Sequence, residues 1–306
     1  MGELFVLVGP TGVGKTAYAL ALAQQYHCPI INADSRQIYK ELPIGTAAPT
    51  AEEQALVKHY FVGTKSILEE YNAGEYEREA LAVIEMQNAR YSKMHRFHQS
   101  SSPREMHRFD SGVIAILTGG SMMYIDAVCN GLDDIPTIAP AVRQEVQERY
   151  SIEGLGFLQR EVERLDPAYW AVVDRANPQR LMHCIEICYQ TGEPYSRLRH
   201  GVKRERPFTI RKIGLNRDRD ELYDRINKRV LKMVDEGLVE EARKAFALCG
   251  EKIPNSLNTV GYKEMHAYLK GQCTLDEAIE QIQRNTRHYA KRQLTWWRRD
   301  KEITWI

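Results

Sequence analysis

A glycine-rich segment near the N-terminus constrains the fold more than any other feature of the chain. It reads GPTGVGKT over residues 9–16, the full G-x-x-x-x-G-K-T pattern. An apolar run over residues 4–8 precedes it and a helical pattern over 14–26 follows, which is the context that a phosphate-binding loop requires. In such a loop backbone N–H groups and the helix N-terminus point at phosphate oxygens. We expect this role for Gly9, Pro10, Thr11, Gly12, Val13, Gly14, Lys15 and Thr16, with the Thr16 hydroxyl able to hold Mg²⁺.

Further strands alternate with helical patterns along the chain. Apolar runs that favour buried strands occupy residues 4–8, 29–33, 113–117 and 208–215, and the helical patterns cover 14–26, 219–235, 238–247, 260–269 and 275–299. This alternation predicts an α/β fold, a P-loop doubly wound parallel sheet.

The segment over residues 135–201 differs from the rest, because it shows helical periodicity, proline-containing helix starts and no convincing strand. We interpret it as an all-helical insertion domain. The sheet domain then consists of residues 1–134 and 202–306. Residues 91–111 are polar, basic, serine-rich and aperiodic, which predicts a mobile loop.

Charge and composition exclude several classes of protein. The net charge is +1, from 42 Lys plus Arg against 41 Asp plus Glu, so any nucleic-acid contact must rest on local basic patches. No apolar stretch approaches the ~18 residues that span a bilayer, so we expect a cytoplasmic protein without a membrane partner. The six cysteines form no C-x-x-C pair or zinc-ligand spacing, which predicts reduced thiols rather than a metal site.

The phosphate-binding loop recognises two linked phosphates and demands neither adenine nor a third phosphate. An ATPase or GTPase usually adds an acidic residue at the end of a later strand, whereas the strand over 113–117 ends in Thr118-Gly119-Gly120-Ser121. The carboxylate instead follows the second strand, at Asp34. Because strand C-termini line the ligand crevice of such a sheet, we expect Asp34 near the bound phosphates; the alternative is a helix cap or turn residue.

Eight segments together carry more information than the loop alone. They are GPTGVGKT (9–16), INADSRQIYK (31–40), IGTAAP (44–49), LTGGSMMY (117–124), NPQRL (177–181), RDELYDRINKRV (219–230), NTVGYKE (258–264) and KRQLTWWR (291–298). In this order, over nearly the whole chain, the set resembles the tRNA dimethylallyltransferases, also called tRNA isopentenyltransferases, of the bacterial type.

The resemblance implies transfer of a dimethylallyl group from dimethylallyl diphosphate to N6 of adenosine 37, beside the anticodon of tRNA, with release of diphosphate. It assigns Asp34 as the general base, and Lys15, Thr16 with Mg²⁺, and Arg219 as the groups that stabilise the leaving diphosphate. A prenyl diphosphate has the linked phosphates that the loop can bind, so the implied donor agrees with the motif. The partners are then the tRNA anticodon arm and dimethylallyl diphosphate, and we expect a monomer.

Positions that match the family's tRNA contacts occur in several segments. The resemblance also implies that the helical insertion, 135–201, closes over the tRNA. Without the resemblance, the sequence alone would favour ordinary surface polarity at these positions. They are Asp34, Ser35, Arg36, Gln37, Ser121, Arg143, Gln179, Arg180, Leu181, Met182, His183 and Lys263.

The C-terminal helix supplies an RNA argument of its own. At 100° per residue a basic face separates from an apolar face that includes Ile282, Tyr289 and Trp297. The basic face would contact phosphates, although a solvated amphipathic helix is the plain alternative. Its members are Arg284, Arg287, Lys291 and Arg298.

Two other functions use the same loop. A small-molecule kinase would bind ATP there and use Asp34 to orient an acceptor hydroxyl, but it leaves the basic helix and the helical insertion unexplained. An RNA-binding module with a vestigial loop is the third interpretation. One departure from the family pattern is Ala48, where a lysine is usual after G-T-A.

Overall fold

Two compact units make up the protein, whose computed structural model describes residues 2–98, 112–201, 203–250 and 253–306. The core unit comprises Met1–Cys129 with Glu205–Ile306, and the helical unit comprises Asn130–Arg204. The sequence interpretation placed the insertion at 135–201, within the helical unit.

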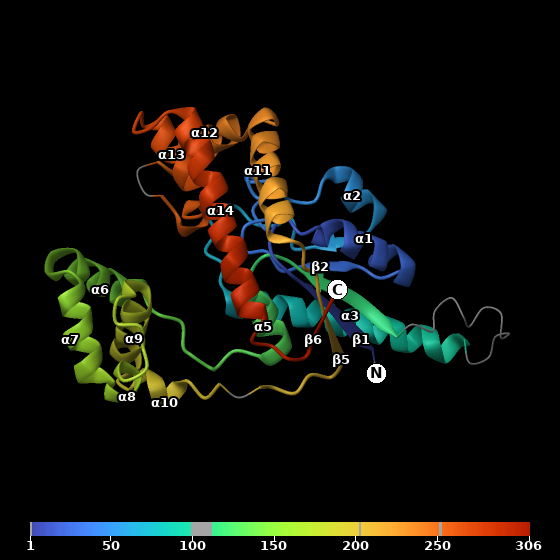
Figure 1. Cartoon of the computed structure of the whole chain (residues 1–306). Helices are drawn as coiled ribbons and strands as arrows, with labels where there is room; N and C mark the ends of the chain where they lie inside the picture. The colour runs from blue at the N-terminus through green and yellow to red at the C-terminus, as the bar shows by residue number, and fades with distance from the viewer. Residues whose placement is uncertain (1, 99–111, 202, 251–252) are drawn as a thin grey trace. The chain divides into compact units, whose positions relative to one another are not determined.

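A six-stranded sheet lies at the centre of the core unit (Figure 1). The order is β3-β2-β4-β1-β5-β6, and every pair of neighbours is parallel. The predicted α/β class and parallel sheet are therefore confirmed. The strands are β1 (Glu3–Val8), β2 (Ile30–Asn32), β3 (His59–Tyr60), β4 (Val113–Thr118), β5 (Thr209–Gly214) and β6 (Ile303–Trp305).

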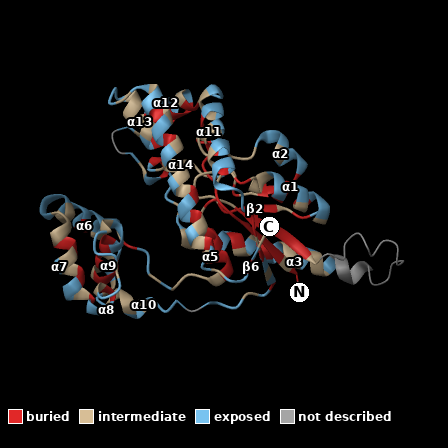
Figure 2. Cartoon of the chain, in the orientation of Figure 1, coloured by how far each residue is buried: buried red, intermediate tan, exposed pale blue. Residues whose placement is uncertain are grey.

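Both faces of the sheet are covered, as the continuous apolar character of β1 requires. Alternate side chains of this strand enter two separate cores, Leu4 and Val6 on one face and Phe5 and Leu7 on the other. Helix α1 (Lys15–Tyr26) packs in the second core and α3 (Ala73–His98) in the first. Strands β1, β2 and β4 are almost entirely buried, whereas β5 and β6 also include exposed residues (Figure 2).

The remaining elements of this unit surround the sheet. The sequence analysis did not predict β3, β6, α2, α3 or α5; of these, β3 and β6, with two and three residues, carry little periodicity. No helix within the described ranges is long and apolar enough to cross a membrane. The helices are α2 (Ala51–Leu56), α5 (Met122–Asn130), α11 (Arg219–Asp235), α12 (Leu238–Cys249), α13 (Tyr262–Leu269) and α14 (Leu275–Trp297), with a 3₁₀ turn η1 (Asn255–Leu257).

The prediction of a loop over residues 91–111 is wrong for residues 91–98. Helix α3 continues to His98, Tyr91 packs against the core, and the Ser92 hydroxyl donates to the Asn88 carbonyl at 2.8 Å. This stretch lacks glycine and proline, so nothing in the sequence stops the helix. Its mostly polar composition hid the helical period, and the rest of the predicted loop, 99–111, lies outside the described residues.

The helical unit contains α6 (Pro140–Glu153), α7 (Leu155–Leu165), α8 (Pro167–Trp170), α9 (Pro178–Thr191) and α10 (Tyr195–Leu198). Its apolar core includes Phe157, Val162 and Ile185. The buried Asp166 caps α8 by accepting from the Tyr169 N–H at 2.9 Å, and it also accepts from the Ser196 N–H and hydroxyl. Both oxygens of the Asp166 carboxylate thus accept hydrogen bonds, and these bonds hold α8 to α10.

Candidate functional site

The GPTGVGKT loop joins β1 to α1 as the sequence predicts. Gly9, Gly12 and Gly14 all have positive φ, a region that disfavours other residues. A Cβ at Gly9 would lie 2.6 Å from the Leu215 carbonyl oxygen, and one at Gly12 would lie 2.9 Å from Ile226. The loop therefore needs glycine for its curvature. At Gly9 and Gly12 it also needs glycine because Leu215 and Ile226 lie too close for a side chain.

Lys15 lies at the start of α1 and folds back over the loop. Its ammonium donates to the Gly9 and Pro10 carbonyl oxygens at 2.8 and 2.9 Å. The pKa of Lys15 is lowered to about 7, mainly by burial and also by the charge of Arg229, while the charge of Asp34 acts in the opposite direction. A bound anion would favour the charged lysine.

Three arginines from α11 and the segment before it contact the same loop. Arg217 donates to the Val13 carbonyl at 2.9 Å and Arg225 to the Gly12 carbonyl at 2.8 Å. Arg229 donates to the Thr11 hydroxyl at 3.3 Å.

Arg229 is a further functional candidate that the sequence reasoning did not select. Burial lowers the pKa of this guanidinium, which lines the cavity beside the loop. By contrast, the side chain of the predicted Arg219 is 77% exposed and pairs with Asp220. The structure thus places Arg229, rather than Arg219, beside the loop.

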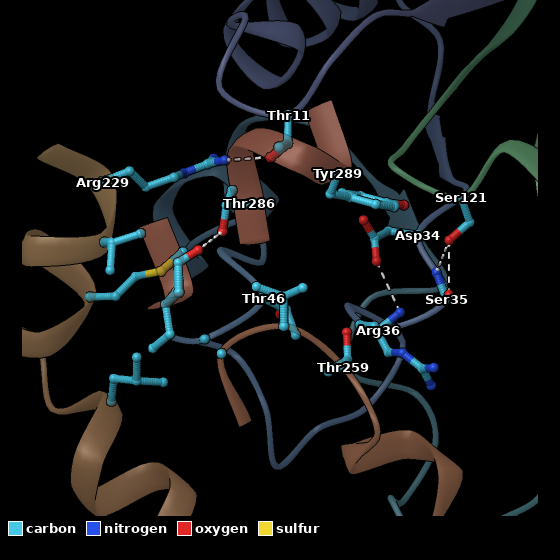
Figure 3. Close-up of a pocket in the computed structure, with 17 residues that line it drawn as sticks. Thr11, Asp34, Ser35, Arg36, Thr46, Ser121, Arg229, Thr259, Thr286 and Tyr289 are labelled. Atoms are coloured by element: carbon cyan, nitrogen blue, oxygen red, sulfur yellow. Dashed lines mark hydrogen bonds between the residues drawn. The ribbon is translucent and has the colours of Figure 1, made fainter. Parts of the chain in front are cut away.

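Asp34 follows β2 and reaches the same region. One carboxylate oxygen accepts from the Arg36 and Gln37 N–H groups at 2.9 and 3.3 Å, which fixes the side chain. Among the described residues none donates a hydrogen bond to the other oxygen, which points toward Tyr289 (Figure 3). A Cβ at Gly120 would lie 2.5 Å from this oxygen, so only glycine leaves room for it.

The segments around Asp34 hold one another in place. The Ser121 hydroxyl accepts from the Ser35 N–H and donates to the Ser35 hydroxyl, both at 2.8 Å. Gln37 donates its amide hydrogens to the Thr46 and Ala47 carbonyls. Four predicted site residues, Asp34, Ser35, Gln37 and Ser121, are therefore part of one connected arrangement.

A buried carboxylate fixes the neighbouring loop over residues 44–47. Glu241 accepts from the Ile44 and Gly45 N–H groups, each at 2.7 Å, and from the Tyr262 hydroxyl at 2.5 Å. Burial and this carboxylate raise the pKa of Tyr262, so its hydroxyl stays a donor. The IGTAAP and NTVGYKE segments are thus tied together beside the site.

A cavity of about 510 Å³ opens above the phosphate-binding loop. Five cationic side chains line it: Lys15, Arg225, Lys228, Arg229 and Lys232. Asp34 and Tyr289 also line it, on the side of the sheet's carboxyl ends. Such a concentration of positive charge suits a ligand with several phosphate oxygens.

A second cavity of about 280 Å³ also has Asp34 in its lining (Figure 3). Its walls combine polar groups with apolar ones such as Met233, Leu238 and Ile282. Of the predicted tRNA-contact residues, Ser35, Arg36 and Ser121 line only this cavity and Asp34 lines both. Gln37 lines only the larger cavity. The residues common to both cavities are Thr11, Asp34, Thr46, Arg229 and Tyr289.

The larger cavity can also accommodate a divalent cation. No group of three or more His, Cys, Asp or Glu side chains suited to a metal occurs in the part of the chain that the structure describes. Thr16 lines the cavity and offers one hydroxyl oxygen. This donor set fits Mg²⁺, which usually keeps several waters and binds through substrate phosphates.

Helix α14 separates its two faces as the sequence predicts. Arg284, Lys291 and Arg298 are exposed. Arg287 is half-buried, donates to Asn227 at 2.6 Å and lies over the Tyr223 ring, so it also joins α14 to α11.

The predicted tRNA contacts of the helical unit divide into two groups. Arg143, Gln179, Arg180 and His183 are exposed, whereas Leu181 and Met182 are buried in the core of the unit. The buried pair therefore corrects the prediction, because successive helical residues cannot all face outward and these two side chains pack α9 against its neighbours. In the core unit, Lys263 is exposed on α13.

Sequence reasoning also missed Gln293, which is 0% exposed on the inner face of α14. A signal was present, since at 100° per residue this position falls about 180° from Arg284, in the middle of the apolar face. A polar side chain there needs partners, because a buried unpaired amide is costly.

Known proteins with similar sequences share one activity in their names. The profile of the family described as IPP transferase matches residues 37–300. A tRNA dimethylallyltransferase 2 from Parabacteroides distasonis is 50% identical over 306 residues, which cover 100% of this chain and 94% of that protein. A tRNA dimethylallyltransferase from Flavobacterium psychrophilum is 40% identical over 312 residues, covering 100% and 94%.

Two solved structures extend the comparison. A tRNA isopentenylpyrophosphate transferase from Bacillus halodurans is 34% identical, with a TM-score of 0.65, over 100% of this chain and 90% of that one. A eukaryotic dimethylallyltransferase described as acting on tRNA is 24% identical, with a TM-score of 0.73, over 97% of this chain and 70% of that one. At that identity the second likeness concerns the fold alone.

Proposed function

Because this chain belongs to the IPP transferase family, we propose that it transfers the dimethylallyl group of dimethylallyl diphosphate to N6 of adenosine 37 in tRNA. It is a tRNA dimethylallyltransferase, and kinase chemistry is not favoured by its relatives. The proposal includes the identity of the donor and the position of the acceptor in tRNA. It also includes a monomeric state and a cytoplasmic location.

One observation carries the proposal: two cavities of different character meet at Asp34. The larger has the phosphate-binding loop and the cationic side chains, which suit the diphosphate of the donor. The smaller is lined by predicted tRNA-contact residues and has apolar walls, which suit a base that has left its stack. A group bound between them would face both a leaving diphosphate and an incoming amine.

Asp34 is placed to act as the general base. The N6 amine is a weak nucleophile, because its lone pair is delocalised into the adenine ring. In the transfer, the bond from N6 to the first prenyl carbon forms as the bond from that carbon to the diphosphate oxygen breaks. The N6 proton passes to the Asp34 oxygen that points toward Tyr289, while the other oxygen keeps its backbone hydrogen bonds.

The departing diphosphate would gain negative charge at the loop as the bond breaks. Lys15 and Arg229 would stabilise it from two sides, together with the N–H groups at the start of α1. Mg²⁺, held by Thr16 and diphosphate oxygens, would add charge neutralisation when bound. We propose Mg²⁺ as the cofactor on this donor set.

The arginine assignment leads to a direct comparison of two variants. We expect Arg229→Ala to weaken pyrophosphate binding roughly tenfold, since a charged hydrogen-bonding partner is removed from a partly desolvated cavity. Arg219→Ala should change it little, because Arg219 is exposed and outside the cavity lining. Titration calorimetry with pyrophosphate and Mg²⁺ measures both. A larger loss for Arg219→Ala would restore that residue to the role that the family motif implies.

We propose that each unit carries its own tRNA-contacting surface, the basic face of α14 in the core unit and the exposed residues of the helical unit. Phosphate contacts of this kind fix the position of a nucleic acid without reading its sequence. On the helical unit the candidates are Arg143, Gln179, Arg180 and His183. Contacts to the anticodon arm would come from these side chains and from Arg284 and Lys291.

Salt dependence tests the basic face. We expect Arg284→Ala with Lys291→Ala to raise the Michaelis constant for tRNA and to flatten its log–log salt dependence by about one unit for each phosphate that no longer has a cationic partner. The constant for the prenyl donor should stay unchanged. Arg287 is left intact because it also holds α14 to α11. Arg211→Ala, which removes an exposed charge paired with Glu3, is the control; a salt slope equal to that of the control would place the tRNA elsewhere.

A product analysis tests the function itself. The purified protein is incubated with Mg²⁺, bulk tRNA and either dimethylallyl diphosphate or ATP, and the products are weighed by mass spectrometry. We expect tRNA heavier by one C₅H₈ unit with the prenyl donor and no phosphorylated product with ATP. ADP formation with unmodified tRNA would support the kinase instead, and no product from either donor would support an RNA-binding module.

A further inference from the structure

The amide of Gln293 connects two parts of the site that are far apart in the sequence. Its Oε1 accepts from the Thr11 N–H at 2.7 Å, and its Nε2 donates to the Gly120 carbonyl at 2.9 Å. Thr11 belongs to the phosphate-binding loop, and Gly120 lies against the oxygen of Asp34 that we assign as proton acceptor. One side chain therefore spans the loop and the segment behind the base.

The environment of this amide makes both hydrogen bonds specific. The side chain is 0% exposed, so water cannot replace a missing partner. An amide presents an acceptor and a donor on adjacent atoms, whereas a carboxylate is an acceptor only and an aliphatic side chain is neither. The Tyr289 hydroxyl donates to the same Gly120 carbonyl at 2.6 Å, so that carbonyl is held from two positions of α14.

We propose that Gln293 is a positioning residue for the transfer, one that fixes the phosphate-binding loop relative to Asp34. This inference rests on the proposed function. The leaving diphosphate is bound on the Thr11 side and the base acts on the Gly120 side, so the span of the amide sets their separation. Reacting groups must be aligned for rapid transfer, and a displacement of 1 Å can cost about 10²-fold in rate.

The effect should fall on turnover rather than on binding. Gln293 lines neither of the two cavities and so would not touch either substrate. We expect Gln293→Leu to lower kcat on the order of tenfold, less than a full 1 Å displacement would cost. The Michaelis constants for tRNA and for the prenyl donor should change less than kcat does.

Gln293→Glu gives a readout that a merely structural role would not produce. When protonated, the introduced carboxyl can accept from Thr11 and donate to the Gly120 carbonyl, as the amide does. When ionised, it faces that carbonyl with a negative charge and loses the second hydrogen bond. Burial should raise the pKa of this carboxyl, so that kcat is near the wild-type value at low pH and falls as pH rises through the raised pKa.

The titratable groups around Gln293 are shared with the wild type. They are Tyr289 on α14, Asp34 beside Gly120, and Arg229 and Lys15 at the loop. The ratio of variant to wild-type kcat at each pH therefore isolates the introduced carboxyl. Gln283→Glu is the matched control, since Gln283 lies on the same helix but donates to the Asn227 carbonyl, away from the loop.

The experiment measures kcat, both Michaelis constants and the melting temperature for the four proteins between pH 5.5 and 8.5, a range of roughly ±1.5 units around neutrality. A kcat ratio that falls with pH for Gln293→Glu only, at constant melting temperature, supports the proposal. A ratio that does not vary with pH, or activity that falls only in step with the melting temperature, overturns it. A wild type that forms no product overturns the proposed function as well, so the two failures are told apart by the wild-type reaction.

Discussion

Replacing Asp34 by alanine is expected to lower the rate of dimethylallyl transfer by about 10²- to 10⁴-fold, the usual contribution of a general base. In the proposed mechanism the carboxylate oxygen that points toward Tyr289 accepts the N6 proton, and no described residue hydrogen-bonds to this oxygen. A base acts mainly on the transition state, so tRNA affinity should stay close to the wild-type value. Single-turnover kinetics at saturating tRNA measures the rate, and a filter-binding titration measures the affinity.

Asp34→Asn is the control for geometry. The introduced amide oxygen can still accept from the Arg36 and Gln37 N–H groups, so the turn after β2 should be preserved. The amide cannot take up the proton, and this variant should be as slow as Asp34→Ala. Turnover near the wild-type rate in either variant would remove Asp34 from the mechanism.

Lys15→Ala is expected to have the second large effect, lowering kcat by roughly 10²- to 10³-fold, as removal of one group that stabilises developing negative charge commonly does. The same change should weaken pyrophosphate binding, because it removes a charged hydrogen-bond donor beside the phosphates. Thr16→Ala should weaken it as well, since the proposed Mg²⁺ ligand is then absent. Rapid-quench kinetics and titration with pyrophosphate and Mg²⁺ give the two quantities.

The control for the removed charge is Lys244→Ala on α12, which is exposed and outside both cavities. Lys15 also donates to the Gly9 and Pro10 carbonyls, so thermal unfolding of each variant is recorded to separate binding from loop stability. Unchanged pyrophosphate affinity in both Lys15→Ala and Thr16→Ala would place the donor elsewhere.

Long patterns in the sequence predicted the elements that position the site. The continuous apolar run of β1 and the glycines after it identified the strand, the loop and α1, because burial on both faces and positive φ leave few other residues. Strands β3 and β6, with two and three residues, escaped prediction, whereas the equally short β2 was predicted from the apolar pattern over 29–33. The end of α3, up to His98, escaped because its apolar residues Tyr91, Met94 and Phe97 are outnumbered by polar ones.

Part of the candidate site could likewise be predicted from the sequence, and part could not. Asp34 could be placed near the loop because strand C-termini meet at one edge of a parallel sheet. The choice among arginines could not be made from sequence, since only the orientation of α11 brings Arg229 to the loop and leaves Arg219 exposed. Likewise, the family motif includes Leu181 and Met182, but their burial appears only once α9 is packed against its neighbours.

The most direct test of the central claim is a nucleoside-resolved analysis of one reaction. Wild-type protein and Asp34→Asn are each incubated with Mg²⁺, tRNA and dimethylallyl diphosphate; the released diphosphate is counted, and the tRNA is digested for mass spectrometry. We predict that wild-type protein places one dimethylallyl group on N6 of the adenosine beside the anticodon for each diphosphate released, and that Asp34→Asn forms neither product at a comparable rate. Diphosphate released without a modified adenosine, or equal yields from the two proteins, would contradict transfer between two cavities that meet at Asp34.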